Sequence, residues 1–103
     1  MERAARMSTE QILDTLERNA GAIRGYGVRS LSLFGSAARG TAGESSDLDF
    51  VVEFTTKSFD CYMDLKAFLE GLFACRVDLV LADAIKPRLR AAILSEAVRA
   101  PGL

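Results

Sequence analysis

The sequence contains no histidine and no tryptophan, and it has only two cysteines and two prolines in 103 residues. The absence of histidine excludes most zinc sites and every catalytic triad that uses an imidazole base. The two cysteines, Cys61 and Cys75, stand in apolar segments without the CxxC spacing of a metal or redox motif. We therefore interpret them as buried, reduced thiols.

A strong charge of one sign and a long apolar run are also missing. The formal net charge of -1 provides no basic surface for bulk nucleic acid, so direct nucleic-acid binding is not expected. No segment approaches the ~20 apolar residues that span a bilayer, and no basic head precedes an apolar run at the start. We expect a cytoplasmic protein without a membrane partner.

What is present is an ordinary globular composition, with 50% hydrophobic and 26% charged residues. The length predicts one small domain over residues 1–103. The opening MERAAR adds little that a fold needs, so Met7 is an alternative start and residues 1–7 are expected to lie outside the ordered domain.

Hydrophobic periodicity predicts alternating helices and strands. A helix capped by Ser8 or Thr9 is expected to run to about Arg24. The elements expected after it are a strand at 28–34, a turn, short helical piece and loop at 35–46, a strand at 48–54, a helix at 61–73, a strand at 76–81 and a helix from 87 to about 98. The order α-β-α-β-α-β-α predicts an α/β fold with a small mixed β-sheet flanked by helices.

The last two helices are expected to bury one face each. Aromatic side chains in and before the helix at 61–73 are predicted to form core or a dimer face, namely Phe59, Tyr62, Phe68 and Phe73. In the closing helix, helical spacing predicts an inward set of Leu89, Ile93, Leu94 and Ala97. Basic residues near that helix are interpreted as a solvated face, with docking to an acidic partner second: Lys86, Arg88, Arg90 and Arg99.

Three aspartates stand at strand positions where charge is unusual. Asp47 and Asp49 open the strand at 48–54, and their spacing of two sends both side chains to the same face. Gly35 and Ser36 close the preceding strand, so an antiparallel pairing would bring them to the same sheet edge. Asp78 stands alone among aliphatic residues in RVDLVL, where a buried carboxylate needs a partner or a metal.

Clustered carboxylates repel one another unless a cation neutralises them, and hard divalent ions such as magnesium match oxygen ligands. A Gly-Ser turn with free N–H groups is in turn suited to an anion. Together these features indicate metal-assisted phosphoryl or nucleotidyl transfer. An EF-hand is excluded because apolar residues interleave with the acids. An aspartyl phosphatase is excluded because the Asp-x-Asp pair precedes its strand, and Glu53 is expected outside the metal shell.

The Gly-Ser and Asp-x-Asp segments resemble the nucleotidyltransferase superfamily related to DNA polymerase β. More closely, LFGSAARG, SDLDFVVEF and RVDLVLADAIKPRLR are similar to the minimal nucleotidyltransferases of the MNT type, the small partners of HEPN-domain toxins. The likeness covers almost the whole chain. Two departures are Thr41, where many relatives have an acid, and the ending RAPGL.

The resemblance implies a role for each motif residue. Gly35 and Ser36 would hold the triphosphate of ATP, and Arg39 would contact phosphate or stabilise the loop. Asp47 and Asp49 would ligate two Mg²⁺ ions, while Asp78 would bind one ion and help orient or deprotonate the attacking hydroxyl.

The same resemblance implies an antitoxin that transfers AMP from ATP to a tyrosine of its HEPN toxin. Two alternatives stay open. The chain could neutralise a partner by binding alone, or it could transfer a nucleotide to a small molecule. The second is disfavoured because the chain has no additional domain to hold such an acceptor.

Overall fold

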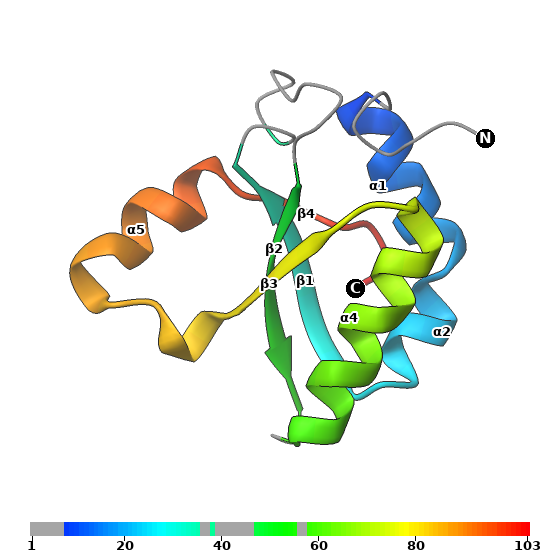
Figure 1. Cartoon of the computed structure of the whole chain (residues 1–103). Coiled ribbons are helices and arrows are strands. Elements are labelled where there is room, and N and C mark those ends of the chain that lie inside the picture. Colours follow the sequence, from blue (N-terminus) through cyan, green and yellow to red (C-terminus); the bar gives the residue numbers. More distant parts are fainter. Residues whose placement is uncertain (1–7, 36–37, 39–46, 56–57) are drawn as a thin grey trace.

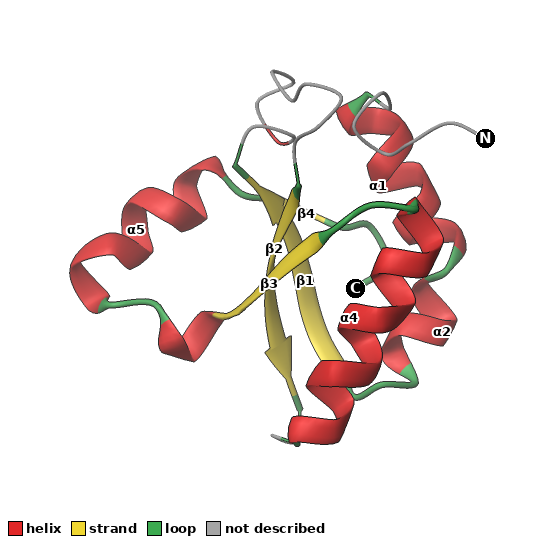
Figure 2. Cartoon of the chain, in the orientation of Figure 1, coloured by secondary structure: helices red, strands yellow, loops and turns green. Residues whose placement is uncertain are grey.

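The computed structural model describes residues 8–35, 38, 47–55 and 58–103. A four-stranded sheet carries three helices on one face, and a further helix extends on its other side (Figure 1). Figure 2 shows the same arrangement by type of element, with helices flanking the strands. The expected α/β fold with a small mixed sheet is confirmed.

The sheet has the strand order β3-β2-β1-β4. Its strands are β1 (Val28–Phe34), β2 (Leu48–Phe54), β3 (Val77–Leu81) and β4 (Val98–Arg99). β1 runs antiparallel to both β2 and β4, whereas β2 and β3 are parallel. β3 therefore forms one edge of the sheet, beside the strand that carries the Asp-x-Asp pair.

The covered face of the sheet packs against helices from both halves of the chain, α1 (Thr9–Arg18), α2 (Ala20–Arg24) and α4 (Phe59–Phe73). A short 3₁₀ turn, η2 (Ala82–Ala84), leads from β3 to α5 (Pro87–Glu96) on the other side. No helix in the described segments is long and apolar enough to cross a bilayer.

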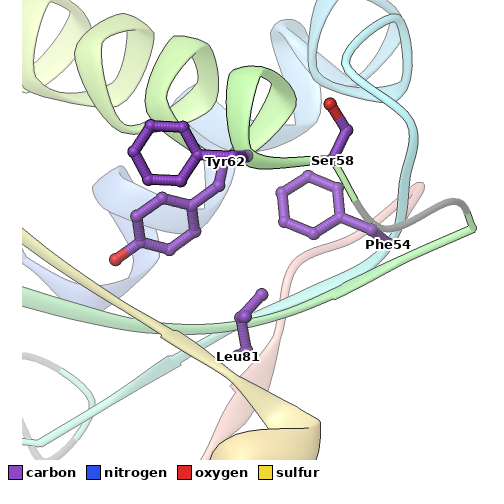
Figure 3. Close-up of a pocket in the computed structure, with 5 residues that line it drawn as sticks. Phe54, Ser58, Tyr62 and Leu81 are labelled. Carbon is purple, nitrogen blue, oxygen red and sulfur yellow. The ribbon is translucent and has the colours of Figure 1, made fainter.

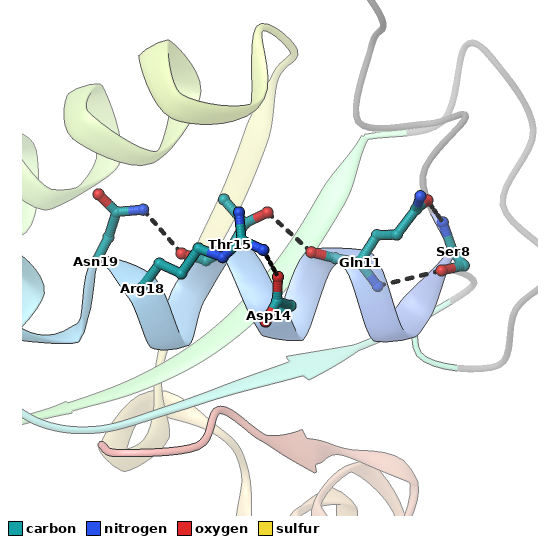
Figure 4. A network of polar contacts seen from close by, with 6 residues as sticks. All are labelled: Ser8, Gln11, Asp14, Thr15, Arg18 and Asn19. Carbon is teal, nitrogen blue, oxygen red and sulfur yellow. Dashed lines mark hydrogen bonds and ion pairs between the residues drawn. The ribbon is translucent and has the colours of Figure 1, made fainter.

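The first helix begins where the sequence predicts but is interrupted before Arg24. Ser8 is the N-cap, and its hydroxyl and backbone exchange hydrogen bonds with Gln11 in a capping box (Figure 4). The chain leaves helical geometry at Asn19, whose side-chain amide donates to the carbonyl oxygen of Thr15 at 2.8 Å. Asparagine competes with the helix backbone in this way, so the expected single helix becomes α1 and α2.

The hydrophobic core lies between the covered face of the sheet and these helices. Alternation along β2 turns Leu48, Phe50 and Val52 inward, each fully buried. They pack in one cluster with buried side chains of the neighbouring strands and helices: Ile12, Leu16, Ile23, Leu31, Leu33, Leu65, Leu69, Phe73, Val77 and Leu79. The odd-numbered residues of β2 therefore point to the opposite face of the sheet.

The end of the chain differs most from expectation. α5 stops at Glu96 rather than near residue 98, and Val98–Arg99 forms β4 against the free edge of β1. Leu89 and Leu94, predicted to point inward, are 46% and 44% exposed, and α5 has no buried residue. Periodicity within the helix could not reveal this, because a face is buried only if another element covers it.

Smaller differences concern element boundaries. α4 begins at Phe59, two residues earlier than predicted, with Ser58 as its N-cap. β3 begins at Val77 rather than at residue 76. The helical piece and loop predicted at 35–46 lie outside the described residues, apart from Gly35 and Ala38.

Candidate functional site

The end of β1 and the starts of β2 and β3 meet at one end of the sheet. The antiparallel register pairs Phe34 with Asp49, and the parallel register pairs Asp49 with Asp78. The antiparallel pairing of the first two strands, which the sequence analysis gave as a condition, is present. The sheet therefore carries Asp78 directly beside Asp49, from a distant part of the chain. We call this end, with Gly35, Asp47, Asp49 and Asp78, the acid edge.

The side chains of Asp49 and Asp78 point to the face of the sheet away from the core. Asp49 lies between Leu48 and Phe50, both fully buried, and Asp78 lies between the buried Val77 and Leu79. Since side chains alternate along a strand, both carboxylates point away from α1, α2 and α4. Asp49 is half-buried, whereas Asp47 and Asp78 are exposed. The argument that Asp78 is a buried carboxylate in need of a partner is therefore wrong.

Gly35 occupies a position that requires glycine. Its φ of +76° is left-handed, and a Cβ at this position would lie 2.5 Å from Oδ2 of Asp49. Any larger residue would meet both backbone strain and the carboxylate. The turn after β1 thus passes against the second acid of the Asp-x-Asp pair. Ser36 and Arg39, the other predicted phosphate contacts, lie outside the described residues.

The donor chemistry of the acid edge fits a hard divalent cation. Asp47, Asp49 and Asp78 supply only carboxylate oxygens, the ligands that magnesium prefers. As placed, no three histidine, cysteine, aspartate or glutamate side chains of the described segments converge closely enough to hold an ion. The strand register is what brings two of these acids together, because it pairs Asp49 with Asp78.

Cys75 lies just before β3 and close to the acid edge. Burial raises the pKa of its thiol above the usual 9.0, and the charges of Asp47 and Glu70 raise it further, against a lowering by a backbone hydrogen bond with Leu48. The thiol is therefore protonated at neutral pH and is not an activated nucleophile. Cys61 and Cys75 are both free, as predicted, but half-buried rather than fully buried.

A cavity lies at the opposite end of the sheet. It measures about 360 Å³ and is lined by Phe54, Ser58, Phe59, Tyr62 and Leu81 (Figure 3). Phe54 and Leu81 are the last residues of β2 and β3, so the strands separate this cavity from the aspartates that begin them. Phe59, predicted as core or a dimer face, is 76% exposed beside it. The cavity is apolar and lacks the carboxylates of the acid edge.

Two polar contacts that α4 makes with β3 were not predicted from the sequence. The hydroxyl of Tyr62 donates to the carbonyl oxygen of Leu79 at 2.6 Å, and a carboxylate oxygen of Glu70 accepts from the N–H of Val77 at 3.1 Å. The sequence contained a signal for the contact of Tyr62. Tyr62 stands on the apolar face of its helix, where a phenol oxygen has to find a partner.

The chain matches the family model described as a nucleotidyltransferase domain over residues 10–100. It is 35% identical over 96 residues to protein adenylyltransferase MntA of Thermococcus cleftensis, an alignment that covers 91% of this chain and 97% of that protein. These two matches span nearly the whole described fold.

Solved structures agree with the sequence comparison. A structure described as a candidate minimal nucleotidyltransferase superposes with a TM-score of 0.79 at 37% identity, covering 90% of this chain and 96% of that one. The MNT antitoxin complex with the tri-AMPylated HEPN toxin of Shewanella oneidensis has a TM-score of 0.61 at 19% identity, covering 88% of this chain and 73% of that one. The second likeness shows the fold alone. On this evidence the chain belongs to the nucleotidyltransferase domain family, as an enzyme of the minimal, MntA-like type.

Proposed function

We propose that the chain is a magnesium-dependent adenylyltransferase that transfers AMP from ATP to a tyrosine of a HEPN-domain partner protein. The proposal draws on the 35% identity to an MntA protein adenylyltransferase over nearly the full chain. The Shewanella complex, in which a HEPN toxin carries AMP groups, suggests the partner class. The observation that carries the proposal is the pairing of Asp49 with Asp78 beside the Gly35 backbone.

We assign roles to the acid edge and to two residues of the segment that follows β1. Gly35 and Ser36 would bind the triphosphate through backbone N–H groups and the serine hydroxyl, and Arg39 would contact phosphate or stabilise the loop. Asp47 and Asp49 would hold two magnesium ions, and Asp78 would be a further ligand of one of them. When bound, the ions neutralise charge on the triphosphate and on the departing pyrophosphate.

The reaction is a substitution at the α-phosphorus of ATP. The tyrosine oxygen forms a bond to that phosphorus, and the bond from the α-phosphorus to the bridging oxygen breaks. Pyrophosphate departs with the electron pair of the broken bond. The phenol proton passes to a base, and we assign this role to Asp78, whose carboxylate is exposed on the face away from the core. The products are the AMP–tyrosine phosphodiester and pyrophosphate.

The open face of the sheet suits a protein acceptor. Among the helices of the described residues, α5 alone extends on this side, and it has no buried residue. A bulky partner therefore has access to the exposed Asp47 and Asp78. A small-molecule acceptor would have to be held by side chains of this chain, and the 360 Å³ cavity among the described residues lies at the far end of the strands.

The test is an intact-mass measurement on the partner. Purified protein is incubated with Mg²⁺, ATP and the product of the neighbouring gene, and the partner is then weighed. We expect it to gain AMP units, and we expect the Asp47→Asn/Asp49→Asn double variant to lose at least about a thousandfold in rate because metal binding is removed.

The matched control is Glu53→Gln, which changes a carboxylate on the same strand outside the acid edge. It should transfer AMP at the wild-type rate. A tight complex without any mass gain in the wild type would contradict the proposal and would leave neutralisation by binding alone. Mass gain on a hydroxyl compound but not on the protein would indicate a small-molecule acceptor.

A further inference from the structure

β3 is an edge strand, and its outer side is held by a helix rather than by another strand. On the inner side, Leu48 of β2 donates its N–H to the carbonyl oxygen of Arg76. Because backbone groups alternate along a strand, Arg76 and Asp78 face β2, whereas Val77 and Leu79 direct their N–H and carbonyl groups outward. Edge groups of this kind otherwise lack a strand partner.

One outward group of Val77 and one of Leu79 are bonded by side chains of α4. Glu70 accepts from the N–H of Val77, and Tyr62 donates to the carbonyl oxygen of Leu79. Tyr62 and Glu70 are eight residues apart, about two helical turns, so they lie on the same side of α4. The helix runs opposite to β3 after the left-handed turn at Ala74, which explains why the later helix residue meets the earlier strand residue.

The two bonds flank Asp78. Its neighbours Val77 and Leu79 are the two residues bonded by α4, and its partner across the sheet is Asp49. The Asp78 side chain is exposed, so packing does not hold it in place. Its position relative to Asp49 therefore depends on the backbone of β3, and the outer side of that backbone depends on Tyr62 and Glu70.

The Glu70 bond is made next to the acid edge. It is made to Val77, the first residue of β3, which directly precedes Asp78. Val77 is paired across the sheet with Leu48, which directly precedes Asp49. The contact is thus one residue away from both aspartates along their strands.

We propose that Tyr62 and Glu70 are positioning residues that hold Asp78 beside Asp49 and so set the affinity of the acid edge for divalent cations. The inference rests on the proposed function, since it assigns Asp78 a metal-binding role. Supporting side chains of this kind commonly change metal affinity by about tenfold or more when they are removed.

The test measures Mn²⁺ binding directly, by electron paramagnetic resonance of the free ion, together with thermal unfolding of each variant. Glu70→Ala removes the acceptor, and we expect it to weaken Mn²⁺ binding about tenfold. Glu70→Gln keeps an acceptor oxygen and should stay close to wild type. Tyr62→Phe removes one hydrogen bond and should weaken binding about fivefold.

The control variants change matched groups elsewhere. Glu53→Ala removes a carboxylate that accepts from the Ser30 hydroxyl, and Tyr26→Phe removes a hydroxyl from a ring that packs on Phe68. Both should bind Mn²⁺ like the wild type. If Glu70→Ala and Tyr62→Phe lower the melting temperature but leave Mn²⁺ affinity unchanged, the two contacts are purely structural and the inference is overturned.

The outcomes also separate this inference from the proposed function. One outcome is that Glu70→Ala binds Mn²⁺ more weakly than the wild type while the wild type transfers no AMP to the partner. This outcome would support the positioning role and overturn the adenylyltransferase reaction. If the wild type transfers AMP and both α4 variants, Glu70→Ala and Tyr62→Phe, bind Mn²⁺ as the wild type does, the adenylyltransferase reaction is supported and the positioning role is overturned. A wild type that binds no Mn²⁺ even with an ATP analogue would overturn both.

Discussion

The two faces of the sheet have opposite properties although the same strands build them. On the covered face, Leu48, Phe50 and Val52 of β2 are fully buried beneath three helices. On the open face, the half-buried Asp49 and the exposed Glu53 flank a buried Val51, and α5 contributes no buried side chain. The comparison teaches that one face carries the stability of the fold and the other is available for chemistry.

The largest expected effect comes from breaking the covered face. Phe50→Ala removes a fully buried ring that stacks on Phe73 with centroids 6.1 Å apart. We expect a loss of about 3–5 kcal/mol in the free energy of unfolding, because the transfer term and the cavity term add. Glu53→Ala on the open face of the same strand should stay within about 0.5 kcal/mol. Urea unfolding followed by circular dichroism measures both, and equal losses would refute the division of roles between the faces.

A second prediction concerns Gly35, where the chain turns beside the open face. Gly35→Ala places a side chain at φ +76° and a Cβ 2.5 Å from the Asp49 carboxylate. Gly27→Ala is a matched control, since its φ is +82° but the nearest atom, Oγ1 of Thr55, is 3.8 Å away. Both variants should lose about 1–2 kcal/mol of stability from the left-handed backbone.

Only Gly35→Ala should also lower the rate of AMP transfer, because only there must the Asp49 carboxylate move. Steady-state kinetics at a temperature where both variants are folded separates the two effects. Equal rates in the two variants would show that the approach of Gly35 to Asp49 has no part in the reaction.

The smallest effect is a pH dependence of stability from Cys75. Burial raises the pKa of the folded thiol above 9.0, so the folded state holds its proton at a pH where the unfolded thiol has lost it. This contribution to stability is therefore complete below about pH 9 and is lost as pH rises through the folded pKa. Between pH 8 and pH 10.5, the melting temperature of the wild type should fall more than that of Cys75→Ala. Parallel falls would contradict the prediction.

Local patterns in the sequence were sufficient for most of the covered face. The strands at 28–34 and 48–54 were predicted with the bounds that the structure shows, and the Ser8 cap marked the start of α1. The exposure of Leu89 and Leu94 was not predictable, because their helical spacing is the same whether or not a second element covers the helix. β4 was missed because a two-residue strand has no periodicity of its own and exists through pairing with β1.

For the candidate site the division is similar. Neighbouring residues in the sequence predicted that Asp47 and Asp49 share a face and that a Gly-Ser turn ends the preceding strand. Of these residues, the structure shows Gly35 directly after β1 and Asp49 within β2. Only the tertiary structure decided that Asp78 lies beside Asp49, that the Gly35 backbone touches that carboxylate and that Tyr62 and Glu70 hold the edge of β3. These relations join segments far apart in the chain. They depend on strand register and helix packing, which arise from the burial of the whole core rather than from any local pattern.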